Sequence, residues 1–188
     1  LAVLLALSLG VGARLLYVGM REVEIGNDYA RVNFALANQL LFDGLEKGSV
    51  DIYVWPTNRA QVFERSGLTI RVVPLHSELE TVTTGSTNFL NHNTSAVFMY
   101  ACSRWDEDRP LAVFLLHLLQ SVEPKAAIVL GEIKADGDLT QYGKEWVESQ
   151  RTWYEQKHEA FVTQEKRTSN TGLVNTPEPL RDSGDPQP

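Results

Sequence analysis

The chain has 188 residues, enough for one domain with a hydrophobic core but short for two. Its net charge of −7 argues against general binding to nucleic acid, and no cluster of Lys and Arg offsets that average. Cys102 is the single cysteine, which excludes an intrachain disulfide and a cysteine-rich zinc site. Because a lone thiol in an apolar run is usually a small core residue, we expect Cys102 to be buried.

The first segment, residues 1–20, is strongly apolar. Residues 1–13 read LAVLLALSLGVGA without a charge, Arg14 interrupts, and the apolar character resumes as far as Met20. A membrane-spanning helix needs about 20 mostly apolar residues, and an Arg near its end can extend towards the lipid headgroups. We therefore expect a single transmembrane anchor over residues 1–20, in contact with lipid through residues 1–19. An uncleaved targeting segment and a buried core element are the alternatives.

The next segments alternate between helical and extended patterns. Residues 28–47 repeat apolar side chains at helical spacing after a capping Asn or Asp, which predicts a helix. The β-branched and aromatic run 50–55 predicts a strand. A short helix should follow and end at Arg65, and residues 68–73 predict a second strand.

The second half continues this alternation. The apolar runs 96–102 and 126–133 both predict strands, and the second suits a strand covered on two faces. Between them, the acidic triplet 106–108 should cap a helix over residues 110–122. Residues 139–161 predict a last amphipathic helix with aromatic side chains on one face.

This order of elements predicts an α/β domain over residues 21–162, built on one small, mainly parallel sheet with flanking helices. Residues 163–188 are polar, contain prolines and have few large apolar side chains. Such a segment cannot bury enough surface to offset its ordering entropy. We expect it to be an extended C-terminal tail that, with the terminal helix, contacts other protein subunits.

The usual chemical motifs do not occur in the sequence. Residues 137–144 read GDLTQYGK, one residue too long for a phosphate-binding loop. The four histidines are far apart, and we expect His117 to pack in the core. We therefore expect no catalytic residue, no metal and no cofactor. Asn93-Thr94-Ser95 fits the N-glycosylation pattern, which matters only if the domain faces a secretory lumen.

The best candidate for a ligand contact is the polar loop formed by Thr84, Gly85, Ser86 and Thr87. Hydroxyls and free amides around a glycine can surround an anion, and an ordinary polar turn is the alternative. The preceding stretch, residues 40–75, resembles one lobe of type 2 periplasmic solute-binding proteins, with a glycine before each strand and a hydrophobic-Asp pair at Val50-Asp51. The resemblance implies that Thr84 to Thr87 touch ligand.

An apolar start, a small domain and a polar tail favour a non-catalytic accessory subunit of a larger membrane protein complex. An energy-transducing complex of the mitochondrial inner membrane, such as one of the respiratory chain, would be a suitable host. The alternative is a membrane-tethered small-molecule binding domain of the solute-binding kind. An enzyme with a dispersed active site is the third hypothesis.

Overall fold

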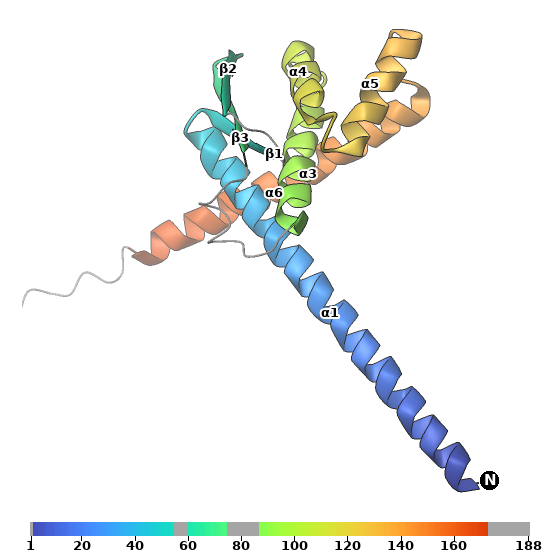
Figure 1. Ribbon diagram of the computed structural model, residues 1–188. Helices are drawn as coiled ribbons and strands as arrows, with labels where there is room; N and C mark the ends of the chain where they lie inside the picture. The colour runs from blue at the N-terminus through green and yellow to red at the C-terminus, as the bar shows by residue number, and fades with distance from the viewer. Residues whose placement is uncertain (1, 55–59, 75–86, 173–188) are drawn as a thin grey trace, which may run out of the picture.

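The computed structural model describes residues 2–54, 60–74 and 87–172 (Figure 1). In chain order its elements are α1 (Ala2–Glu46), β1 (Ser49–Val54), β2 (Gln61–Arg65), β3 (Leu68–Pro74), α3 (Thr87–Ser103), α4 (Arg109–Leu119), α5 (Pro124–Asp136) and α6 (Gln141–Gly172). Helices thus combine with one small sheet, in line with the expected α/β class.

Helix α1 is a single element of 45 residues, about 68 Å long. The anchor and the helix expected over residues 28–47 are therefore one helix, and the expected cap at Asn27 or Asp28 lies in its interior. Only its C-terminal part packs on the body, and the rest projects away (Figure 1). No helix in the described part of the chain has an apolar stretch sufficient to cross a membrane, so the expected transmembrane helix is unsupported.

The sheet has three strands in the order β1-β3-β2. Strand β1 pairs with β3 in parallel, whereas β2 pairs with β3 antiparallel, so the sheet is mixed rather than mainly parallel. The short helix expected before Arg65 is strand β2. Ser66 and Gly67 both have positive φ, 50° and 75°, which is the backbone of the two-residue turn that suits a hairpin.

Two segments expected to be strands are helices. Residues 96–102 lie in α3, and residues 126–133 lie in α5. Helix α3 is central: it packs against α1, α4, α6 and β1. Every side chain from Ala96 to Ser103 is buried, so the sequence shows no polar face to reveal the helical period.

Helices α4 and α5 each begin after an acidic residue that caps the N-terminus of the helix. The carboxylate of Asp108 accepts a hydrogen bond from the Leu111 amide at 3.0 Å, so the acidic triplet caps α4 as expected. Glu123 similarly accepts from the Lys125 amide at 3.3 Å, and Pro124 occupies the first position of α5. A proline is well tolerated there, so Pro124 starts a helix as well as following one.

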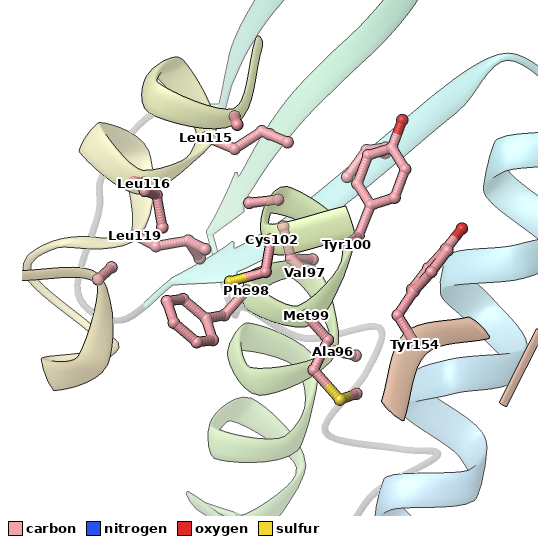
Figure 2. Packing of buried hydrophobic residues seen from close by; sticks show 14 of the residues in the cluster. Ala96, Val97, Phe98, Met99, Tyr100, Cys102, Leu115, Leu116, Leu119 and Tyr154 are labelled. Atoms are coloured by element: carbon pink, nitrogen blue, oxygen red, sulfur yellow. The ribbon is translucent and has the colours of Figure 1, made fainter. Parts of the chain in front are cut away.

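The core lies where α3 meets α4, α6 and α1, and Figure 2 shows part of it. Leu115, Leu116 and Leu119 of α4 pack on one side of α3, while Tyr154 of α6 packs near Tyr100 on another. The terminal helix was expected to end near residue 161, but α6 continues to Gly172. The first part of the expected extended tail, residues 163–172, is therefore helical, and residues 173–188 lie outside the described residues.

Candidate functional site

The loop singled out in the sequence is largely outside the described residues. Thr84, Gly85 and Ser86 fall there, and Thr87 is the first residue of α3. The proposed ligand contact at this loop therefore stays a prediction.

Asn93 has a structural role that its glycosylation pattern does not suggest. Its amide oxygen accepts a hydrogen bond from the Tyr53 backbone amide at 3.1 Å, and its Nδ2 donates to the Asp51 carbonyl at 3.5 Å. The side-chain amide of Asn93 thus pairs with backbone groups on the free edge of β1, as the backbone of a neighbouring strand would. It is 1% exposed, so a glycan on Nδ2 is incompatible with this packing.

A charged hollow of about 510 Å³ lies between the start of α4 and α6. Its carboxylates and cations pair with one another: Asp138 lies 3.7 Å from Arg109 and 3.1 Å from Lys144. Arg151 lies 2.6 Å from Asp106 and 2.5 Å from a carboxylate oxygen of Glu148. These pairs are partly exposed, so each contributes little to stability. Of these pairs, the one between Arg151 and Asp106 links α6 to the α3–α4 connection.

Electrostatics in this hollow follow from these contacts. The backbone amide of Leu139 and the ammonium of Lys144 lower the pKa of Asp138 below its usual value. Arg109 also stacks on the ring of Trp105, with its guanidinium carbon 4.2 Å from the ring centroid. Across the described residues, no three His, Cys, Asp or Glu side chains come together in a way that could hold a metal ion.

Cys102 faces this hollow from α3 and is buried, as expected from the sequence. Burial raises the pKa of the Cys102 thiol to about 12, and Lys125 only partly opposes this effect. The thiolate is the reactive form of cysteine, so Cys102 is not a nucleophile at neutral pH. The sequence expectation of a core cysteine is confirmed.

The histidines differ from expectation at one position. His117 was expected to pack in the core, but its side chain is exposed on α4. His158 contacts the ring of Phe42 at 5.3 Å between ring centroids, and burial lowers the pKa of His92. His76 lies outside the described residues.

A groove between α1 and α6 contains a buried polar group that the sequence did not single out. The side-chain oxygen of Asn38 is buried and has no hydrogen-bond partner among the described residues. Phe34, Phe42 and Phe161 line the same groove. An unpaired buried amide oxygen costs about 1–3 kcal/mol, so the joint between α1 and α6 is not optimised for stability.

The most unusual surface is the projecting part of α1. Nine large apolar side chains between residues 15 and 32 are more than 40% exposed: Leu15, Leu16, Tyr17, Val18, Met20, Val23, Ile25, Tyr29 and Val32. They occupy more than one face of the helix, because residues at every angle about the axis are represented. A surface of this size on a soluble monomer usually marks an interaction site.

Comparison with known proteins gives no family for the chain. No family model, no curated protein and no solved structure matches it.

Proposed function

We propose that this chain is a non-catalytic accessory subunit of a larger membrane protein complex, and that α1 attaches it to that complex. The observation that carries the proposal is the length of α1 that projects from the body with apolar side chains exposed. A helix without tertiary contacts is only marginally stable in water, and exposed apolar side chains make it prone to association. Contact with lipid or with another protein would stabilise the helix and cover its exposed apolar side chains.

The proposed attachment surface is a stripe on α1, formed by the exposed side chains of Val18, Ile25, Tyr29 and Val32. At about 100° per residue these four side chains fall within a sector of about 60°. The stripe leads towards Leu36 and the groove between α1 and α6, which Val32 also lines. A partner or a membrane surface in contact with the stripe would therefore reach the body as well.

The terminal helix offers a second contact for neighbouring subunits. Tyr142 and Trp153 are exposed on α6, whereas Tyr154 packs inward, so the aromatic face expected from the sequence is divided between core and surface. Exposed aromatic side chains are enriched where proteins meet. An energy-transducing complex of the mitochondrial inner membrane remains the proposed host, and this part of the proposal is supported only by the sequence.

The test replaces Val18, Ile25 and Tyr29 by Gln, a good helix former. The intact chain should sediment with membranes and migrate on native gels far above 21.0 kDa, and the variant should lose both properties. The matched control replaces the polar neighbours Arg21, Glu22 and Glu24 by Gln and should behave like the intact chain. A triple variant that still co-migrates with the complex contradicts the proposal.

A further inference from the structure

The groove between α1 and α6 is positively charged, although the chain as a whole has a net charge of −7. It lies where α6 crosses α1 (Figure 1) and has a volume of about 580 Å³. Arg31 of α1 and Lys157 of α6 line it, and no carboxylate does so among the described residues. A cavity of this size and charge suits a small anionic group.

Both cations of the groove are available to an anion. Arg31 lies 3.9 Å from Asp28, but the two side chains are 83% and 69% exposed, so this ion pair is weak. Lys157 forms no ion pair within the described part of the chain, and its ammonium lies 6.0 Å from the centroid of the Phe34 ring. A cation over an aromatic ring keeps its full charge, so Lys157 can still bind an anion.

The groove also contains the unpaired amide of Asn38. This side chain is 7% exposed, and its Oδ1 has no hydrogen-bond partner among the described residues. Buried polar atoms are nearly always paired, with protein, water or a ligand. The last torsion of an asparagine side chain has a broad preference, so the amide can turn its oxygen towards the groove. The groove therefore offers an acceptor to an N–H or O–H donor.

The acceptor and the cations are close enough to bind one headgroup. Arg31 and Asn38 are seven residues apart and fall within about 20° of each other around α1. Asn38 follows Phe34, the ring beneath the Lys157 ammonium, by four residues or about 6 Å along the axis. An anion on the two cations can thus carry a donor that reaches Asn38.

The end of the groove nearest the projecting part of α1 is apolar. Val32 lines the groove and is 65% exposed, and Tyr29, about one turn earlier, is 66% exposed. Both belong to the stripe proposed above for attachment. A ligand with its anion between Arg31 and Lys157 would therefore have an apolar surface beside it, which favours an amphipathic molecule over a soluble anion.

We propose that this groove binds the headgroup of an anionic phospholipid that carries a free hydroxyl, of the phosphatidylglycerol kind. The phosphate oxygens accept hydrogen bonds from Arg31 and Lys157, and a headgroup hydroxyl donates to Asn38 Oδ1. The acyl chains lie against Val32 and Tyr29. This inference rests on the proposed function, because it needs a membrane beside the body, and it adds the class of lipid that the body recognises.

The first test titrates the full chain, in a neutral detergent, with short-chain phospholipids by isothermal titration calorimetry. Phosphatidylmethanol has the phosphate and charge of phosphatidylglycerol without a hydroxyl, and phosphatidylcholine has no net charge. We expect phosphatidylglycerol to bind about tenfold more tightly than phosphatidylmethanol, a factor typical of one hydrogen bond, and phosphatidylcholine to bind least. Equal affinities for phosphatidylglycerol and phosphatidylcholine overturn the proposal. So does equally tight binding of glycerol phosphate, which would identify a soluble ligand.

The second test removes the acceptor by Asn38→Leu, which has a similar size and no amide. The variant should lose the preference for phosphatidylglycerol over phosphatidylmethanol. Its midpoint in urea should not fall, because a buried unpaired oxygen is removed with the amide. A variant that keeps the tenfold preference shows that Asn38 does not bind the hydroxyl, and overturns the proposal.

The third test removes a cation and keeps Asn38. Lys157→Gln should weaken the binding of both anionic lipids by about fivefold and leave their ratio unchanged. The matched control is Lys166→Gln, because Lys166 is exposed on the same helix nine residues later and therefore on its opposite face. The control should bind both lipids like the wild type. Equal affinities for the Lys157 and Lys166 variants contradict the proposed phosphate contact.

Attachment to a complex is measured separately from lipid selectivity. Asn38→Leu and Lys157→Gln leave Val18, Ile25 and Tyr29 in place, so both variants should still sediment with membranes and migrate with the complex. A chain that migrates with the complex but shows no headgroup selectivity therefore rejects the lipid site and leaves the proposed attachment intact.

Discussion

The side chain of Asn93 forms hydrogen bonds with the backbone at the edge of β1, where no further strand pairs. Replacing it by Ala leaves the Tyr53 amide without the partner it has at 3.1 Å, at a buried position. We expect Asn93→Ala to lower the free energy of unfolding by about 1–3 kcal/mol in urea denaturation. Asn91→Ala changes an exposed side chain two residues earlier and should stay within about 0.5 kcal/mol of wild type. Equal free energies of unfolding for the two variants would show that the Asn93 hydrogen bonds do not contribute to stability.

Cys102 makes stability depend on pH in the alkaline range. The thiol ionises near 9.0 when unfolded, and burial raises its pKa to about 12 in the folded chain. Between these values the unfolded state binds fewer protons, so stability falls as pH rises, by up to about 1.4 kcal/mol per pH unit. Burial raises the pKa of Tyr154 to about 12 and adds to the same trend at higher pH.

The measurement compares wild type with Cys102→Ala in denaturation curves at several pH values above 9. The variant should lose stability less steeply than the wild type, whatever its stability at neutral pH. A thiol reagent at pH 8 should also leave native Cys102 unmodified and react once the chain is unfolded. Parallel curves for the two proteins would contradict the assigned burial effect.

At the scale of the elements, α3 and α5 are joined by a buried carboxylate. Glu123 accepts a hydrogen bond from the Ser95 hydroxyl at 2.9 Å, and its other oxygen caps α5. We expect Glu123→Ala to cost about 1–2 kcal/mol, because both the cap and the cross-helix bond are lost. Ser95→Ala should cost less, because the cap remains.

A double-mutant cycle separates these two roles. The double variant should be less destabilised than the sum of the single variants, by about 0.5–1.5 kcal/mol, because the Ser95–Glu123 bond is counted in both. Strict additivity would mean that the two side chains do not interact.

The elements that the sequence predicted correctly have strong local signals. Strands β1 and β3 are rich in β-branched residues, and α4 has Asp108, Pro110 and an amphipathic pattern. Strand β2 was missed because Ser66-Gly67 was interpreted as the end of a helix, although it equally suits a hairpin. Helix α3 was missed because burial on several sides removes the polar face on which the helical period depends.

At the scale of the whole molecule, the sequence indicated the apolar start but not its continuity with the following helix. Gly26, Asn27 and Asp28 are typical of a helix boundary, yet α1 passes through them. The candidate surfaces were also only partly predictable. Exposed apolar side chains on α1 follow from composition, whereas the charged hollow depends on bringing Asp106 and Asp138 beside α6, which no local pattern contains.

The projecting part of α1 should be dispensable for the folding of the body. Deleting residues 1–26 removes helix that projects away from the rest of the chain (Figure 1). We expect the urea midpoint of the monomer to stay within the range of a neutral surface change, while helical circular dichroism decreases. A large drop in the midpoint would show that the projecting helix supports the core.

The contacts of Phe42 have a consequence for how the protein is made. This side chain of α1 lies 5.7 Å from Tyr154 and 5.1 Å from Phe161, measured between ring centroids, and both partners belong to α6. A ribosome releases Phe42 long before either partner, so the apolar face of α1 emerges without the helix that covers it. Long-range closure of this kind is slow. Biosynthesis of this chain should therefore depend on chaperones that shield its first helix until translation is nearly complete.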